Sequence, residues 1–381
     1  MYNQYDPYED DYSFENPLLL MLCIVLCAAS VIGLCYLLIT QQGATMHSKV
    51  EDFSIADSFQ KRLSLTLDTK PVEEHFSSTT YTLDDKQLVA PKPDPSSYGI
   101  AEDAAQMQSI LEQARTKLNM NTSLFQTDTQ IFPGSSIMYY LDDTIFAVTW
   151  KQVFNDCVYT FSEVKISHPS QFRRFFSDGR FGSGVLRTTT EMAQTVNAVV
   201  ASSGDYYGYR SIGIVVNDGK VFRHMGHFLD TCYIDDNGDL LFTYAGSIKD
   251  QQTAQQYVDD HNVRFSISFG PVLIEDGNFC VPGDYNSGEI NSKYARAALC
   301  QMDSLHYVVV TANTEDPHYS VPTVADFGRT LLSLGIPRAY ALDGGQTAAI
   351  AMDGKLINKV SYGSQREISD IIYFATAIPN E

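Results

Sequence analysis

Two glycine-containing segments stand out because each can bring an aspartate carboxylate next to exposed backbone amides. Asp205 lies within SGDYYG (203–208), and Asp343 lies within ALDGGQT (341–347). Glycine lets backbone N–H groups approach a ligand closely, which suits a phosphate or a sugar hydroxyl. The adjacent carboxyl group can act as a general acid or base, or hold a hydroxyl. Each segment is also consistent with a tight turn in which the aspartate only caps the backbone.

Two arginines could supply positive charge to the same chemistry. Arg296 and Arg366 each lie at the edge of an apolar segment. A guanidinium group recognises phosphate or carboxylate through paired hydrogen bonds, so either residue could hold an anionic substrate. Taken singly, each is equally consistent with a structural ion pair.

The histidines and cysteines show no metal-binding spacing. His224 and His227 are three residues apart, but a strand-to-turn context gives them no common helical face. His306 lies within an apolar strand pattern and is predicted to be a hydrogen-bonded histidine of the core or a sheet edge. The cysteines after residue 40 are scattered and form no CxxC pair. The sequence therefore predicts neither a metal site nor another cofactor.

The composition excludes some classes of protein. The chain has 381 residues with 46 acidic and 26 basic side chains, which gives a net charge of −20. A nucleic-acid-binding protein needs a basic surface, so this balance argues against one. With 44% hydrophobic and 12% aromatic residues the chain can build a core. A mean hydropathy of −0.14 excludes a protein that crosses a membrane many times, but not a single span.

An uncharged apolar run covers residues 18–39. At about 1.5 Å per residue it spans roughly 33 Å as a helix, enough to cross the hydrocarbon core of a bilayer. A cleaved signal peptide would have a basic start and a shorter apolar run, whereas residues 1–16 contain no lysine or arginine. We therefore predict an acidic tail (1–16), a transmembrane anchor (17–40), a stalk with a helix near 101–119 (41–129) and one folded domain (130–381).

Within the predicted domain, short β-forming segments alternate with tight turns. Asp-Gly or Asn-Gly pairs, which are typical of hairpins, begin at Asp218, Asn237, Asp276 and Asp353. Helical patterns are fewer and lie near 188–201, 247–260 and 321–335. The predicted fold class is α+β: a large twisted, mainly antiparallel sheet with a few packed helices, preceded by a single transmembrane helix and a stalk.

Several segments resemble, in order, the motifs of one protein family. NAVVASSGDYYGYRSIGIVVNDGKVFR is similar to A-I-N-G-D-Y-Y-G-x-R…G-x-V-I-x-N-G, and SFGPVLIEDGN to F-G-P-x-L-x-x-D-G. KYARAALCQMDSLHYVVV is similar to N-P-R-T-A-I-G…V-V-V, ALDGGQTAAIAM to N-L-D-G-G-G-S-S-x-M, and SQREISDIIYF to E-R-x-x-x-D-x-I-x-F. This order resembles the phosphodiester glycosidase domain family over residues 130–376.

The resemblance implies hydrolysis of a sugar-1-phosphodiester, of the N-acetylglucosamine type, in cell-surface glycan or exopolysaccharide metabolism. Water would attack the anomeric carbon and the phosphomonoester would leave. By position, Asp205 and Asp343 are the implied catalytic carboxylates, and the sequence does not indicate which of them is the acid. The implied substrate-binding residues are Ser203, Gly204, Arg296, Gly344, Gly345, Thr347 and Arg366.

Departures from the family pattern leave a second interpretation open. The asparagine that precedes Gly-Asp in the family is Ser203 here, and the third glycine of its D-G-G-G motif is Gln346. The glutamate before the closing arginine is Gln365. Each lost polar group removes a possible bond to the transition state. The alternative is a catalytically degenerate domain that binds glycan or glycan phosphate as a cell-surface or assembly module.

Two arguments about membrane orientation disagree. The only nearby basic residues, Lys49, Lys61 and Arg62, follow the apolar run, which favours a cytoplasmic C-terminal side. The resemblance implies work on glycans outside the cytoplasm. Because the basic excess is small and distant, we expect a single-pass membrane protein whose C-terminal domain is extracytoplasmic. The expected partners are a glycan or sugar phosphodiester and the membrane, with no nucleic acid.

Overall fold

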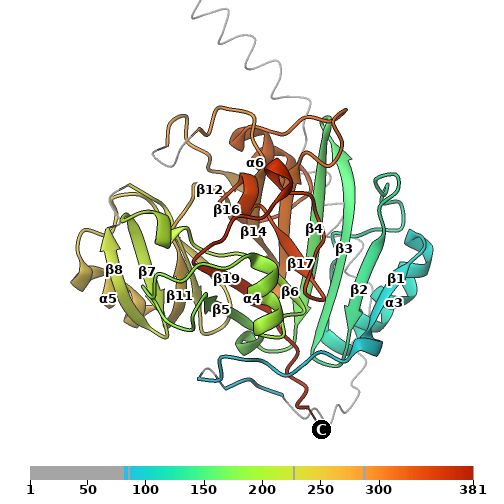
Figure 1. Cartoon of the computed structure of the whole chain (residues 1–381), viewed down its shortest axis with the longest axis horizontal. Coiled ribbons are helices and arrows are strands. Elements are labelled where there is room, and N and C mark those ends of the chain that lie inside the picture. The colour runs from blue at the N-terminus through green and yellow to red at the C-terminus, as the bar shows by residue number, and fades with distance from the viewer. Residues whose placement is uncertain (1–80, 85, 226–227, 286–288, 381) are drawn as a thin grey trace, which may run out of the picture. The chain divides into compact units, whose positions relative to one another are not determined.

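The computed structural model of the chain describes residues 81–84, 86–225, 228–285 and 289–380 (Figure 1). These residues fall within one compact unit, 77–381. The predicted acidic tail, the predicted transmembrane anchor and the first half of the predicted stalk lie outside the described residues. Within the described part of the chain, no helix is both long and apolar enough to cross a membrane.

The largest sheet has nine strands in the order β1-β2-β3-β4-β15-β14-β16-β12-β13, all paired antiparallel. Its strands are β1 (Tyr98–Ala101), β2 (Ile137–Leu141), β3 (Ile145–Phe154), β4 (Cys157–Ile166), β12 (Val272–Glu275), β13 (Asn278–Phe279), β14 (Arg296–Asp303), β15 (His306–Asn313) and β16 (Arg338–Leu342). Strands β14 and β16 lie side by side near its centre, and both lead to the candidate site.

Two five-stranded antiparallel sheets complete the fold. One has the order β10-β9-β11-β7-β8 and consists of β7 (Gly213–Asn217), β8 (Lys220–Met225), β9 (Thr231–Asp235), β10 (Leu240–Thr243) and β11 (Val263–Ile267). The other has the order β18-β17-β6-β19-β5 and consists of β5 (Phe172–Phe176), β6 (Val200–Ser203), β17 (Ile350–Met352), β18 (Lys355–Leu356) and β19 (Asp370–Phe374). The predicted α+β class with antiparallel pairing is confirmed, but three sheets share the strands.

Strand β3 has apolar side chains on both faces, which explains why the large sheet is covered by other layers. Ile145 and Ala147 belong to a core shared with both five-stranded sheets, whereas Phe146, Val148 and Trp150 belong to a core on the opposite face. Successive side chains of a strand point to opposite faces. Because both faces of the large sheet are apolar, each must be covered by another layer.

Helices cover one of these faces. Helix α3 (Ala104–Leu118) begins after the N-cap Asp103 and ends at Asn119, whose φ of 50° is left-handed. Its buried side chains belong to the same core as Trp150. The predicted helix near 101–119 is therefore confirmed, and it packs as part of the folded unit. Strand β1 also pairs with β2, so the fold begins well before residue 130.

The remaining helices and hairpins follow the sequence signals. Helices α4 (Thr189–Thr195), α5 (Gln251–Asp260) and α6 (Val324–Ser333) fall within the three predicted ranges. The four predicted turns connect β7 to β8, β9 to β10, β12 to β13 and β17 to β18. Asp218, Asp276 and Asp353 adopt positive φ, each followed by a glycine of positive φ, as two-residue hairpin turns require.

Candidate functional site

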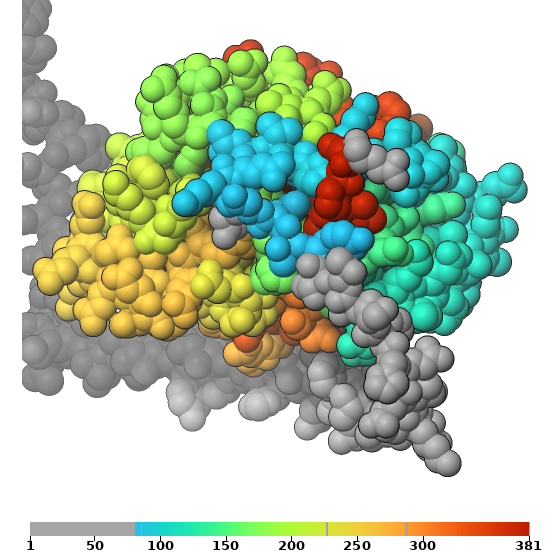
Figure 2. Space-filling view, turned by 90° about the horizontal axis from the view of Figure 1, so that it is seen from below, coloured from blue at the N-terminus to red at the C-terminus, as the bar shows by residue number. Residues whose placement is uncertain are grey.

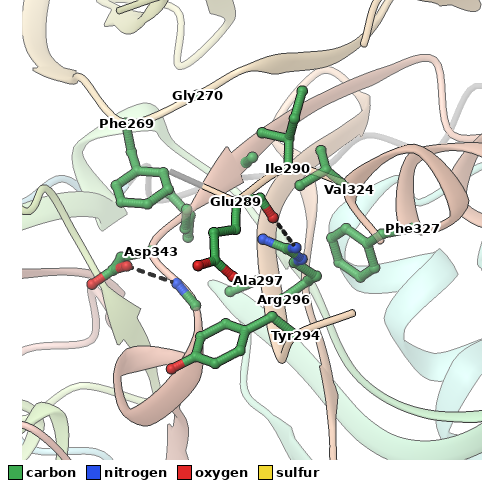
Figure 3. Close-up of a pocket in the computed structure, with 13 residues that line it drawn as sticks. Phe269, Gly270, Glu289, Ile290, Tyr294, Arg296, Ala297, Val324, Phe327 and Asp343 are labelled. Atoms are coloured by element: carbon green, nitrogen blue, oxygen red, sulfur yellow. Dashed lines mark hydrogen bonds between the residues drawn. The ribbon is translucent and has the colours of Figure 1, made fainter. Parts of the chain in front are cut away.

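A cavity of about 320 Å³ lies where β16 ends and β14 begins. Ala297 of β14 pairs with Leu342 of β16. This pairing brings their neighbours Arg296 and Asp343 to the same edge of the sheet. Both residues line the cavity together with Gly344 (Figure 3). Three of the sequence-predicted site residues therefore meet at one cavity.

Asp343 lines this cavity and has one unpaired carboxylate oxygen. Its Oδ1 accepts a hydrogen bond from the backbone N–H of Gly344 at 2.9 Å. Its Oδ2 is buried and has no hydrogen-bond partner among the described residues. Burial raises the pKa of Asp343, while the Thr347 hydroxyl and the positive charge of Arg210 oppose that rise. A buried polar atom without a partner marks a place where a ligand can supply the missing bond.

The two glycines after Asp343 are required by close packing. A Cβ on Gly344 would lie 2.2 Å from the carbonyl oxygen of Ala295. Gly345 has a φ of 69°, and a Cβ there would lie 2.6 Å from the Tyr294 hydroxyl. Any larger residue would displace the strand or the ring. Glycine therefore holds the Asp343 loop against the cavity wall.

Thr347, predicted to bind substrate, closes the same loop. The loop forms the short helix η4 (Gly345–Thr347). The Thr347 hydroxyl donates to the carbonyl of Gly344 at 2.7 Å. The residue is buried, so the structure assigns its hydroxyl a loop contact.

Arg366 lies near Asp343 beside a pair of stacked tyrosines. Its Nη1 donates to the hydroxyl of Tyr206 at 3.2 Å, and its guanidinium lies 5.9 Å from the centre of the Tyr209 ring. The rings of Tyr206 and Tyr209 stack at 4.8 Å. Arg366 is exposed and its charge acts to lower the pKa of Asp343. Arg366 is not among the residues that line the cavity, and its predicted contact with substrate stays a prediction.

Arg210 is a site residue that the sequence reasoning missed. Its guanidinium lies 4.4 Å from the Phe269 ring centre and 5.0 Å from that of Tyr206. Its Nε and Nη2 atoms are buried and have no hydrogen-bond partner in the described part of the chain. Its charge acts on both Asp205 and Asp343. Its position two residues after the DYYG segment was the available signal.

Arg296 is held by the backbone around the cavity. Its Nη2 donates to the carbonyls of Glu289 and Ser292 at 2.9 and 2.6 Å, and its Nε lies 3.5 Å from the carbonyl of Pro322. Burial lowers the pKa of Arg296, and Glu289 opposes this. The guanidinium thus fixes two loops at the cavity edge. Its predicted role as a clamp for phosphate stays a prediction.

Asp205 lies in a buried ionic network away from the cavity lining. Its Oδ2 accepts from the backbone N–H of Ser268 at 3.0 Å and lies 3.9 Å from Nη2 of Arg174. Arg174 also donates through Nε to Asp370 at 2.5 Å. Burial raises the pKa of Asp205, and Arg174 opposes this. The structure therefore separates the two predicted catalytic carboxylates: Asp343 lines the cavity, and Asp205 supports the sheet behind Phe269.

Ser203 and Gly204 belong to this buried region. Ser203 ends β6 opposite Ile371 and is 2% exposed. A Cβ on Gly204 would lie 2.8 Å from Oδ2 of Asp370. Glycine is needed there to admit the Asp370 carboxylate. Their predicted contacts with substrate stay predictions.

Two further cavity residues were absent from the sequence prediction. Glu289 lines the cavity, and Figure 3 shows its carboxylate turned into the space between Asp343 and Arg296. Tyr294 lines the opposite wall. Glu289 lies outside the motifs compared above, and Tyr294 lies within KYARAALCQMDSLHYVVV but was not singled out there. Only the pairing of β14 with β16 brings their segment to Asp343.

The structure describes His306 but not His227, the second residue of the histidine pair considered from the sequence. His306 is buried and its Nε2 lies 2.8 Å from Oε1 of Glu163, which confirms a hydrogen-bonded core histidine. His227 lies outside the described residues. Among the residues that are described, no group of three or more histidine, cysteine, aspartate or glutamate side chains is arranged to hold a metal ion.

Residues 194–375 match the family model described as phosphodiester glycosidase. This range contains Asp205, the Asp343 loop and both predicted arginines, whereas Arg174 lies before it. Residues 194–375 are therefore similar to the phosphodiester glycosidase family, which confirms the predicted resemblance over this part of the chain.

Similar proteins occur in Bacillus subtilis, zebrafish and Synechocystis. The SPbeta prophage-derived protein YomE of Bacillus subtilis (strain 168) is 26% identical over 200 residues, which cover 50% of this chain and 30% of YomE. The chain thus spans less than a third of that relative's length. The catalytic domain of zebrafish N-acetylglucosamine-1-phosphodiester alpha-N-acetylglucosaminidase, auto-inhibited by its pro-peptide, is 17% identical with a TM-score of 0.47, covering 61% of this chain and 82% of the zebrafish domain. A hypothetical protein from Synechocystis is 12% identical with a TM-score of 0.43, and the match covers 61% of this chain and 62% of the Synechocystis chain.

Proposed function

We propose that this domain hydrolyses a sugar-1-phosphodiester at the cavity beside Asp343. The main observation that supports this proposal is that Asp343, which lines the cavity, has a buried and unpaired Oδ2. Asp343 also lies close enough to Arg366 for the arginine charge to act on it. A carboxyl group of raised pKa can keep a proton that it later donates. Arg366 and Arg210 offer positive charge to an anionic phosphate. The family match supports the reaction class.

The reaction needs an acid, a water molecule and a place for negative charge. In our proposal, the protonated Asp343 donates its proton to the phosphate oxygen that leaves the anomeric carbon. Glu289, whose carboxylate lines the same cavity, accepts a proton from water as the water oxygen bonds to that carbon. The C1–O bond breaks, and the products are the free sugar and a phosphomonoester. Two carboxylates with separate roles are the usual arrangement in glycoside hydrolysis.

The test is turnover by the full-length chain, purified in mild detergent because of the apolar run at 18–39. We expect release of free sugar from N-acetylglucosamine-1-phosphodiesters within a panel that varies the sugar and the alcohol. Asp343→Asn should reduce kcat at least a hundredfold, the lower range for removal of a general acid. Asp353→Asn, an exposed hairpin position that tolerates asparagine, is the matched control. No turnover of any panel member would contradict the proposal.

A glycan-binding module without turnover is the second candidate. Two groups that were predicted to act on substrate, Asp205 and Arg296, already have internal hydrogen-bond partners. Fewer polar groups are then free to stabilise a transition state. The same panel separates the candidates, because a binding module would show saturable binding in calorimetry and no sugar release.

We further propose that the apolar run at 18–39 anchors the protein and that the domain works outside the cytoplasm, in cell-surface glycan or exopolysaccharide metabolism. The length of that run and the glycan chemistry of the family support this arrangement. The protein should stay with membranes during alkaline carbonate washing. External protease should digest the domain in intact cells. Release by carbonate, or protection from external protease, would contradict the proposed topology.

A further inference from the structure

We propose that a cavity of about 710 Å³ beside the Asp343 cavity is a second saccharide subsite. It would hold a pyranose ring covalently linked to the phosphodiester bound at Asp343, so the inference rests on the proposed function. That ring could be the next sugar of the glycan or a sugar on the alcohol side of the phosphate. The chemistry of recognition is the same for both.

The two cavities adjoin at Tyr294, which lines both. The Tyr294 ring packs against Gly345 of the Asp343 loop, where a Cβ would lie 2.6 Å from its hydroxyl. The ring itself is 40% exposed. A ligand too long for the first cavity would therefore pass Tyr294 and enter the second. The apolar faces of aromatic rings pack well against the C–H faces of sugars.

Tyr362 lies at the far side of this subsite in an unusual state. It lines the second cavity and is 84% exposed. Its φ of 60° and ψ of 13° are left-handed, within the short element η5 (Ser361–Gly363). This conformation is uncommon for a bulky residue and costs on the order of 1 kcal/mol. A large aromatic side chain held in solvent by a strained backbone indicates a contact with something outside the chain.

The segment that carries Tyr362 is tied to the candidate active site by Gln346. The Gln346 side-chain amide donates to the carbonyl of Ser364 at 3.1 Å and lies 3.4 Å from its hydroxyl. The backbone carbonyl of Gln346 accepts from the N–H of Arg366 at 3.3 Å. Gln346 stands where the family pattern has a third glycine. A glycine could not make the side-chain bonds, so this tether belongs to the present sequence.

The base of the second cavity is polar and carries a positive balance. Nζ of Lys151 lies 2.7 Å from Oε2 of Glu315, whose Oε1 accepts from the backbone N–H of Lys359 at 2.7 Å. Nζ of Lys359 donates to the carbonyl of Glu315 at 2.6 Å. Two lysines thus face one glutamate in a chain with a net charge of −20. These fixed groups suit the hydroxyls of a sugar and any anionic substituent on it.

Three ligands test the subsite by calorimetry on the full-length chain with Asp343→Asn, which slows turnover. The first is the methyl diester of N-acetylglucosamine 1-phosphate. The second adds a methyl glucoside on the alcohol side of the phosphate, and the third replaces the sugar with chitobiose. We expect at least one two-sugar ligand to bind about tenfold more tightly than the first. Tyr362→Ala should remove this gain and leave the affinity for the first ligand unchanged.

Two further variants distinguish a contact made by the Tyr362 ring from an effect of the backbone conformation at this position. Tyr362→Gly keeps the left-handed conformation without strain and should also lose the gain, whereas Tyr362→Phe should retain it. Phe222→Ala, at a residue 41% exposed on another sheet, is the matched control and should change nothing. Equal affinity for all three ligands, a gain that survives Tyr362→Gly, or no binding of any ligand would overturn the subsite. If the unaltered chain hydrolyses its substrate but no two-sugar ligand binds more tightly, only the subsite is overturned. If a two-sugar ligand binds more tightly but the unaltered chain shows no hydrolysis, only the proposed hydrolysis is overturned.

Discussion

The backbone N–H of Asp205 donates a hydrogen bond to Oδ1 of Asp370 at 2.9 Å, although the two residues are 165 positions apart. The other oxygen of Asp370 accepts from Nε of Arg174 at 2.5 Å. Arg174 also donates to the carbonyls of Val216 and Ser266, at 3.1 and 2.8 Å. One buried guanidinium thus joins the two five-stranded sheets, and both carboxylates depend on it.

Above pH 8, where Asp370 is ionised, we expect Asp370→Asn to destabilise the protein by about 3 kcal/mol, the usual cost of removing one partner from a buried ion pair. An amide can accept only one of the two bonds that Asp370 accepts, and its N–H groups would face Arg174. Urea unfolding should report the change. Asp353→Asn, on an exposed hairpin, should leave the unfolding midpoint unchanged. A loss for Asp370→Asn as small as that of the control would contradict the role of this network.

The same residue predicts how stability depends on pH. Burial, and the nearby charge of Asp205, raise the pKa of Asp370 to about 7 from an ordinary 3.8, although Arg174 opposes the rise. The folded protein therefore holds a proton that the unfolded chain releases. This contribution to stability is fully present below about pH 4 and is lost as pH rises to about 7.

The measurement is the free energy of unfolding at several pH values for the unaltered chain and for Asp370→Asn. The difference between the two should be larger at pH 4 than at pH 7, by a few kcal/mol, and constant above pH 8. A difference that grows with pH would show that the carboxylate is ionised throughout.

Local signals in the sequence were enough for much of the fold. Paired residues such as Asp218-Gly219 specify a two-residue turn through their own φ preference, so the hairpins could be placed without the rest of the chain. The spacing of Met107 and Leu111 likewise predicts a helix. That helix packs in the core instead of lying in a stalk because Leu111 meets the apolar face of the large sheet, a face that becomes recognisable only once β3 is paired.

The residues that line the cavity were harder to predict, because pairing between distant segments of the chain decides which side chains reach it. Glycine beside aspartate marks both Asp205 and Asp343, yet only Asp343 reaches a cavity. Asp205 is covered because β19 brings Asp370 against it, and no local pattern reports that pairing. Glu289 has no distinctive neighbours in the sequence. It reaches the cavity through the backbone contacts of Arg296.

If Asp343 is the acid, the pH dependence of activity follows from its environment. Burial raises its pKa, so the protonated form persists to higher pH than for an ordinary aspartate. We expect kcat/KM to fall as pH rises through that raised pKa. Arg366→Gln removes a charge that lowers the pKa, and it should move the fall to higher pH. An unchanged or lower transition in this variant would assign the titration to another group.

Gln346→Gly restores the glycine of the family pattern and removes the side-chain bonds to Ser364. We expect the free energy of unfolding to change by less than about 1 kcal/mol, because the lost bonds are exposed. Hydrogen exchange at the amide of Gly363 should become faster, since the Tyr362 segment loses its tether. Gln365→Ala, which removes a neighbouring amide bonded to Thr190, is the control. Equal exchange of Gly363 in the unaltered chain and in Gln346→Gly would contradict the tether.

Arg296→Lys separates a positioning role from contact with phosphate. A lysine can donate to one or two carbonyls but cannot reproduce the planar group that meets Glu289, Ser292 and Pro322. If positioning dominates, the variant should lose about 1 kcal/mol of stability, the usual net contribution of a hydrogen bond. Its kcat should fall more than its KM rises, because Glu289 would lose its fixed place at the cavity. A clamp for phosphate predicts the reverse: a raised KM, nearly unchanged stability and partial rescue by the positive charge of lysine. Urea unfolding and steady-state kinetics on the same preparation distinguish the two, with Arg329→Lys on the exposed side of α6 as the control.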